Sequence, residues 1–233
     1  RGPSAVLGLR RDRVSIVVNR DLAGAFGDAR DQGARPTCLA FASSDCHAAM
    51  LGPWDPLSCE WIYHRAQARS GRSPADGATL ESMLEALRHD GQPIEAEWPY
   101  QPTVVEPWTP PAGSPAVFRA AGEATAADVD AVVAMLDSGR PAVMLMTLSR
   151  SFYLPDPDGV VRAAAGELPD PAVRHAVVAT AHGVVDGREA VRVRNSWGTG
   201  WGADGSAWLD RDFLAARLFA AFGLLGVEDV FAD

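Results

Sequence analysis

The sequence predicts an α+β fold of two halves with a cleft between them, and two observations support this. Helical patterns fill the chain from residue 37 to residue 91, whereas strand patterns dominate from residue 141 to residue 210. Helices followed by a run of strands are typical of α+β folds rather than of alternating α/β folds. At 233 residues the chain can bury a core of its own, so we expect two closely packed halves.

Capping residues mark where the predicted helices begin. We expect helices at residues 37–50, 57–69, 79–91 and 125–138. Pro36 favours a helix start because its fixed φ suits the first turn, while Ser58 and Thr79 carry side chains preferred at N-caps. Leucine and methionine recur at helical spacing within "TLESMLEALRHDG", and Gly91 ends that pattern. The first half of the chain is therefore predicted to be mostly helical.

Strands are predicted on both sides of this helical region. A short β-branched run within residues 12–22 comes before it, and a Pro-rich extended connector at residues 92–118 follows it. Further strands are expected at residues 141–148, 175–185, 189–197 and 205–210. The second half is therefore predicted to be mostly β.

These patterns suggest approximate boundaries within a single domain that spans residues 1–233. The helical lobe is expected at about residues 37–115 and the β-rich lobe at about residues 116–212. Residues 1–17 are expected to form an N-terminal extension. Residues 213–233 form an apolar segment that either packs on the domain or docks a partner or parent protein.

Composition and charge argue against several classes of function. The net charge is −9 and no stretch gathers basic residues between aromatic ones, so we expect no binding to nucleic acid. No apolar run reaches the length of about 18 residues that spans a membrane as a helix. Neither CxxC nor HExxH occurs, and no glycine-rich loop joins a strand to a helix. We therefore expect no metal ion and no cofactor.

The three cysteines, Cys38, Cys46 and Cys59, are too few for a disulfide framework, and their number is odd. Buried free thiols are the simplest interpretation of Cys46 and Cys59, with a disulfide between them as the alternative. The low cysteine count favours a reducing compartment such as the cytoplasm, while the localisation itself stays open.

Cys38 lies in the first turn of a predicted helix, where a nucleophile would be favoured. An isolated cysteine is most often a packing residue, because a free thiol with a pKa near 8.5 is mostly protonated at neutral pH. The N–H groups at a helix N-terminus lower that pKa, and an imidazolium partner lowers it further. A catalytic role for Cys38 therefore requires a histidine from elsewhere in the chain.

Five histidines are candidates for this partner: His47, His64, His89, His175 and His182. Of these, His175 begins the apolar strand "HAVVAT", where a side chain can project from the edge of the β half into a cleft. Asn195 follows "AVRVR" and could accept a hydrogen bond from one ring nitrogen of His175, leaving the other nitrogen to face the sulfur. Trp197 could shield that bond from water.

Three stretches together resemble the papain family of cysteine peptidases. They are "DQGARPTCLAFA", "RHAVVATAHGV" and "VRVRNSWGTGWGADGSAWL", in the order and at nearly the spacing of that family. The stretches "ADGATLESMLEALRHDG" and "SRSFYLPDPDGVV" are similar to bacterial members. The resemblance spans about residues 17–210. It implies a papain-like two-lobed fold, with a helical left lobe, an antiparallel β-barrel-like right lobe and the active site in the cleft between them.

The resemblance also implies roles for individual residues. Cys38 would be the nucleophile, His175 the general base and then acid, and Asn195 the residue that orients the imidazole. Gln32 would give its amide to the oxyanion hole beside the Cys38 N–H. Trp197 is expected beside the substrate.

Two further positions match the family's substrate-binding loop. Gly77 and Ala78 would pair with the substrate backbone as a short extended strand. This contact gives affinity without much choice of side chain.

The sequence departs from the family pattern beside the expected site. Arg35 and Pro36 replace the usual cysteine and glycine before the nucleophile, which removes a structural disulfide and is expected to reshape the cleft wall. Arg174 replaces a small residue directly before His175. We expect this cation either to lower the pKa of His175 or to contact an acidic side chain of the substrate.

The predicted function is that of a cysteine endopeptidase, which hydrolyses a peptide or protein substrate through a thioester acyl-enzyme. One alternative is a catalytically silent peptide-binding or regulatory module on the same scaffold. Another is an amidase or transacylase that directs the thioester to a different acceptor.

Overall fold

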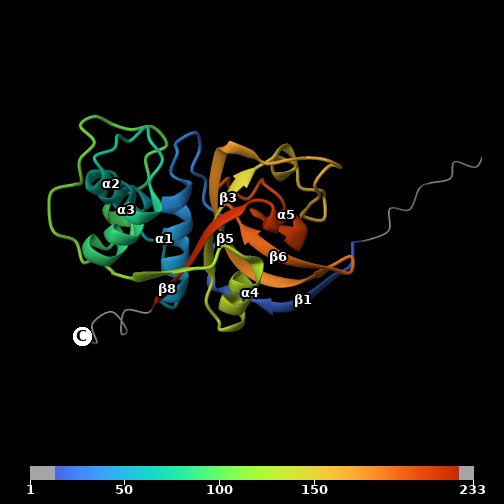
Figure 1. Cartoon of the computed structure of the whole chain (residues 1–233). Coiled ribbons are helices and arrows are strands. Elements are labelled where there is room, and N and C mark those ends of the chain that lie inside the picture. The colour runs from blue at the N-terminus through green and yellow to red at the C-terminus, as the bar shows by residue number, and fades with distance from the viewer. Residues whose placement is uncertain (1–13, 226–233) are drawn as a thin grey trace, which may run out of the picture.

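The structure, a computed structural model, describes residues 14–225, and Figure 1 shows a group of helices beside a large sheet. The helices are α1 (Cys38–Met50), α2 (Cys59–Ser70), α3 (Leu80–Glu85), α4 (Val129–Asp137) and α5 (Arg211–Ala215). The strands are β1 (Ile16–Asp21), β2 (Ala121–Thr125), β3 (Ala142–Leu148), β4 (Val160–Val161), β5 (Asp170–Val185), β6 (Arg188–Arg194), β7 (Ser206–Asp210) and β8 (Leu218–Leu225). This architecture confirms the predicted α+β, two-lobed fold.

The helices of the first lobe start where their caps predict. α1 begins at Cys38, directly after Pro36 and Thr37. Ser58 Oγ accepts a hydrogen bond from the N–H of Trp61 (3.1 Å) at the start of α2. Thr79 Oγ1 accepts one from the N–H of Ser82 (3.1 Å) at the start of α3. α3 is shorter than predicted, because the chain passes into a π-helical turn at Ala86–Asp90.

β5 is the strand on which the sheet is built. The sheet has the order β2-β8-β3-β5-β6-β7-β4, and β1 also pairs with β5. The first part of β5 pairs with β3, while its second part pairs with β1 and β6. All of these pairs are antiparallel, whereas β4 pairs with β7 in parallel. A strand of 16 residues can therefore join several strands of the second lobe.

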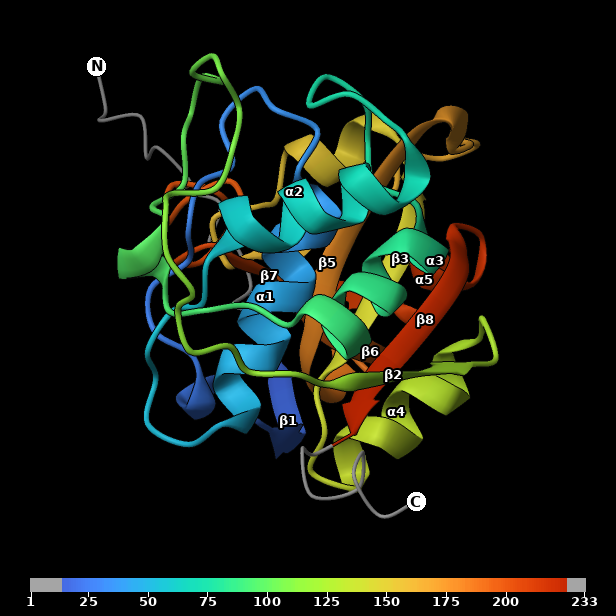
Figure 2. The ribbon, with the colours of Figure 1, turned by 90° about the vertical axis from the view of Figure 1, so that its left-hand side faces the viewer.

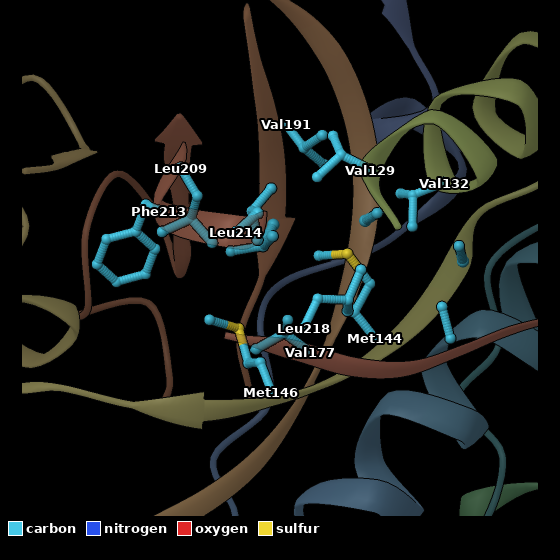
Figure 3. Packing of buried hydrophobic residues seen from close by; sticks show 14 of the residues in the cluster. Val129, Val132, Met144, Met146, Val177, Val191, Leu209, Phe213, Leu214 and Leu218 are labelled. Atoms are coloured by element: carbon cyan, nitrogen blue, oxygen red, sulfur yellow. The ribbon is translucent and has the colours of Figure 1, made fainter. Parts of the chain in front are cut away.

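The two faces of β5 pack against different cores because side chains alternate along a strand. Ala176 and Val178 belong to the core that includes side chains of α1, α2 and α3. Figure 2 views this layer, with α1 against β5 and with α2 and α3 on the outer side. Val177 and Ala179 point the other way, into the core shown in Figure 3. β5 is thus the wall shared by both lobes.

The prediction for the C-terminal segment, 213–233, was incomplete. Leu218–Leu225 is not peripheral but forms β8, which lies between β2 and β3 in the sheet. Phe222 and Leu224 pack in the helix-side core, while Leu218 and Ala221 pack in the other. Strand β2 was missed as well.

Burial on both faces explains why the sequence of β8 shows no alternation of polar and apolar residues. Because Leu218–Leu225 pairs within the sheet, this stretch is not a free docking segment. The expected docking by residues 226–233 lies outside the described part of the chain.

The strand predicted within residues 12–22 is confirmed as β1, but the boundary of the N-terminal extension differs from expectation. β1 starts at Ile16, inside the stretch 1–17 that was expected to be an extension, and pairs with β5 through Ile16↔Val185 and Val17↔Val184. The expectation for residues 1–13 lies outside the described residues. Between residues 14 and 225, the structure contains no helix that is long and apolar enough to cross a membrane.

Candidate active site

Cys38 lines a cleft between the two lobes. The cleft has a volume of about 650 Å³ and is lined by side chains of both lobes, among them Gln32, Cys38, His175 and Trp197. Cys38 is half-buried, whereas Cys46 and Cys59 are fully buried, and all three are free thiols. Only Cys38 therefore presents its sulfur to the cleft.

The Cys38 sulfur lies in a largely dry environment that contains local hydrogen-bond donors. Burial raises the pKa of the thiol, while the backbone N–H groups of Ala176 and Leu39 act in the opposite direction. Leu39 belongs to the first turn of α1, and Ala176 follows His175 on β5. Backbone donors from both lobes thus favour negative charge on this sulfur.

His175 and Asn195 are joined by a short hydrogen bond of 2.7 Å between Nε2 and Oδ1. The N–H of Ser196 donates to the same oxygen (2.8 Å), which fixes this atom as the amide oxygen. Because an amide oxygen only accepts, His175 Nε2 carries the proton and Nδ1 is left as the basic nitrogen. Burial lowers the pKa of His175 to about 4, and the bond to Asn195 acts against this shift.

Aromatic rings cover the imidazole of His175. The ring of Trp197 lies 4.7 Å from it, and the ring of Phe152 meets it edge-on at 5.9 Å. Tyr153 stacks on Trp197 at 5.2 Å. Trp197 therefore covers His175 as the sequence predicts, while no role was predicted for Phe152 and Tyr153, although both belong to the stretch "SRSFYLPDPDGVV".

Gln32 lies at the edge of the cleft and is almost completely buried. Its Nε2 donates to the carbonyl of Arg35 (2.8 Å), and its Oε1 accepts from Ser196 Oγ (2.6 Å). Its backbone carbonyl accepts from the hydroxyl of Tyr100 (2.7 Å). Both polar atoms of the side-chain amide are thus hydrogen-bonded, which fixes the orientation of the side chain.

Arg35 is among the residues that line the cleft, but its guanidinium is held in a buried ion pair. The guanidinium forms a buried, two-pronged ion pair with Glu60, with distances of 2.7 and 3.0 Å. Glu60 also accepts from the indole N–H of Trp108 (2.6 Å) and the backbone N–H of Gln101 (3.0 Å). The side chain of Arg35 therefore fastens the loop before Cys38 to α2.

The predicted substrate-binding residues all line the cleft. Gly77 and Ala78 lie on the loop between α2 and α3, and a Cβ added at Gly77 would meet no atom within 4 Å. Arg174 is exposed at the opposite wall, over the ring of Phe219 at 5.5 Å. The low pKa of His175 is caused by burial, not by this arginine.

A buried carboxylate that sequence reasoning missed links the segments of the site. Asp45 of α1 accepts from Arg30 Nε (2.8 Å) and from Arg194 Nε (2.7 Å). Arg194 directly precedes Asn195, and Arg30 lies two residues before Gln32. Asp45 itself lies seven residues after Cys38, two helical turns along α1. No local pattern marks a contact between residues this far apart in the sequence.

We expect Asp45→Ala to lower the free energy of unfolding by about 3–5 kcal/mol, because it leaves the buried Arg194 guanidinium without its counter-charge and leaves Arg30 with Glu95 alone. Denaturant unfolding measures this change. The matched control is Asp130→Ala, which removes a carboxylate that is bonded twice to Arg211, at 2.7 Å each, but is 75% exposed. This control should leave stability nearly unchanged. Equal losses in the two variants would contradict a special role for the buried charge.

Among the residues that the structure describes, no group of three or more His, Cys, Asp or Glu side chains is placed to hold a metal ion.

The sequence of this chain matches a known protein family. The family model described as "Papain family cysteine protease" matches residues 19–215. Cysteine proteinase 1 of Entamoeba histolytica is 62% identical over 34 residues, a match that covers 15% of this chain and only 11% of that protein.

Solved structures agree with this match at the level of the fold. Xylellain, a cysteine protease from Xylella fastidiosa, superimposes with a TM-score of 0.74 at 22% identity, covering 91% of this chain and 87% of that one. Procathepsin L 3 of Tenebrio molitor larval midgut gives 0.71 at 16% identity, covering 93% and 72%. With a model match over most of its length and the same fold, the chain belongs to the papain family of cysteine proteases.

Proposed function

We propose that this protein is a cysteine endopeptidase that uses Cys38 as its nucleophile, His175 as acid and base, and Asn195 to orient the imidazole. The observation that carries the proposal is the 2.7 Å bond from His175 Nε2 to Asn195, made beside a cleft that Cys38 also lines. This bond leaves Nδ1 free to accept a proton. A thiol and a base on opposite walls of one cleft form the minimal unit for acyl transfer.

The first step forms a thioester. His175 Nδ1 takes the proton of the Cys38 thiol while the sulfur attacks the peptide carbonyl carbon. Burial disfavours a lone thiolate and a lone imidazolium, as the raised pKa of Cys38 and the lowered pKa of His175 indicate. The two charges are therefore best created together, as a pair, when the substrate closes the cleft.

The tetrahedral oxyanion is assigned to two donors. One is the backbone N–H of Cys38 at the start of α1. The other is the amide of Gln32, which has two N–H groups and uses one of them on Arg35. Donors aimed at such developing charge typically contribute about 3–4 kcal/mol to barrier reduction.

Collapse of the tetrahedral intermediate breaks the peptide C–N bond. The proton held by His175 goes to the leaving amine, and the acyl group stays on Cys38 as a thioester. His175 then removes a proton from water as the water oxygen attacks the thioester carbon; the C–S bond breaks, and His175 returns this proton to the leaving Cys38 sulfur, which releases the acid and restores the thiol. The substrate backbone is proposed to lie along Gly77 and Ala78, with Trp197 beside the leaving group.

We predict that an epoxysuccinyl inhibitor adds once to the native protein, because only the Cys38 thiol faces the cleft. Intact-mass spectrometry should show one adduct, which is lost in Cys38→Ala and forms about 100-fold more slowly in His175→Ala. Cys46→Ala and Cys59→Ala are matched controls, because both thiols are fully buried. These controls should label like the native protein.

A peptide-library digest run in parallel separates the alternatives. Hydrolysed peptides are expected, while acyl transfer to added amines would favour a transacylase. Selective binding of peptides without turnover would favour a silent module. Absence of selective labelling at Cys38 would contradict the proposal.

The pH profile of cleavage is expected to have an acid limb near pH 4. Protonated His175 cannot accept the Cys38 proton, so kcat/KM falls as the pH falls through the pKa of His175. Burial lowers that pKa from 6.5 to about 4, which keeps the imidazole neutral at pH 5–6. Rates of a fluorogenic peptide between pH 3.5 and pH 7, with circular dichroism as a check of folding, test this. An acid limb centred near pH 6.5 in a folded protein would contradict it.

A further inference from the structure

The charge of the cleft is opposite to the charge of the protein. The chain carries a net charge of −9, yet among the described residues that line the cleft there are three arginines and no aspartate or glutamate. Arg35 is one of the three, but its guanidinium is buried against Glu60. The available positive charge therefore belongs to Arg72 and Arg174, which are exposed on the cleft walls.

The two arginines differ in how far nearby carboxylates compensate their charge. Within residues 14–225 neither forms an ion pair with a carboxylate. Asp76 lies on the same loop as Arg72, and the pKa of its carboxyl is lowered mainly by hydrogen bonds from Ser73 and to a smaller extent by Arg72. Asp170, on the same strand as Arg174, is engaged with the N–H of Ala172 (2.9 Å). Arg174 is thus the less compensated cation.

Arg174 is held in place by a feature of β8. In the pairing with β3, Leu145 faces Ala220 and Met146 faces Leu218, so Phe219 between them is an unpaired, bulged residue. A bulge re-aims a side chain out of the regular pleat. The ring of Phe219 lines the cleft and lies 5.5 Å below the Arg174 guanidinium. Stacking restrains the planar cation, while its N–H edge stays free for a carboxylate.

The wall around this cation is apolar. Leu145, Leu148 and Val173 line the cleft beside Phe219 and Arg174. A side chain with a hydrocarbon stem and a terminal carboxylate matches this combination, because its stem covers apolar surface while its charge meets the guanidinium. Glutamate has this shape. Glutamine has the same shape without the charge.

We propose that the cleft selects peptides with an acidic side chain, glutamate above all, at the position that contacts Arg174 and Phe219. This inference rests on the proposed peptidase function. Arg174 adjoins His175, and consecutive residues of an extended peptide are about 3.3 Å apart. The selected side chain is therefore within about three residues of the scissile bond.

The test compares pairs of fluorogenic peptides that differ only by Glu or Gln at one position within three residues of the cleaved bond. At one position the native protein should give a kcat/KM about three- to tenfold higher for Glu, the size expected for a partly exposed ion pair. This ratio should fall towards one in Arg174→Gln and in high salt, and it should decrease in Phe219→Ala. Because each variant is described by the ratio of its kcat/KM values for the Glu and Gln peptides, a general loss of activity does not change the result.

Arg150→Gln is the matched control, because Arg150 is exposed but does not line the cleft. It should leave the Glu-to-Gln ratio at its native value. Equal rates for Glu and Gln at every position would overturn the inference while leaving the peptidase proposal intact.

Binding to the Cys38→Ala variant separates the two proposals. Fluorescence anisotropy with the same labelled peptides should show tighter binding of the Glu member. If no peptide is cleaved and Cys38 resists labelling, the peptidase proposal fails, and this binding ratio still decides the selectivity. Equal affinities for the two members would overturn it.

Discussion

The rest of the site depends on the two ion pairs that the Asp45 carboxylate forms. It bonds to Arg30 and to Arg194, and thereby links α1, the loop that leads to Gln32 and the end of β6 that leads to Asn195. Arg194 also donates to the carbonyl of Gly27 (2.7 Å), which ties the same loop to the sheet. Buried ion pairs lose much of their Coulomb energy to desolvation, so we interpret this cluster as a device that fixes geometry. One charged centre thus sets the relative positions of both lobes.

Other contacts stabilise the two walls of the cleft, and they leave the thiol of Cys38 and Nδ1 of His175 free to react. Arg35 and Glu60 form a buried ion pair that ties the loop before Cys38 to α2. On the opposite wall, aromatic rings exclude water from the bond between His175 and Asn195. Exclusion of water strengthens the fixed dipoles that act on the developing charges. The Cys38 thiol and the His175 imidazole are left as the groups that can exchange a proton.

The sequence predicts the local parts of this arrangement and misses the distant ones. The start of α1 at Cys38 follows from Pro36 and from the apolar pattern after it, and the motif order correctly anticipates that Gln32, His175 and Cys38 meet in one cleft. β8 escapes prediction because burial on both faces removes the alternation that marks a strand. Arg194 and Asp45 are separated by 149 residues, so no local pattern records their contact. Arg35 lines the cleft, but its guanidinium is buried against Glu60 of α2, a partner 25 residues away that no local pattern indicates.

The most direct test of the linking role of Asp45 is to break its ion pair with Arg194. One then measures how strongly the reactivity of Cys38 still depends on His175. The measurement is the ratio of the alkylation rates of Cys38 with and without His175→Ala, determined in the native, Arg194→Gln and Arg192→Gln backgrounds. Arg192 lies on the same face of β6, two residues before Arg194, and serves as the control. We predict that the ratio collapses in folded Arg194→Gln and persists in Arg192→Gln. An unchanged ratio in folded Arg194→Gln would contradict the account.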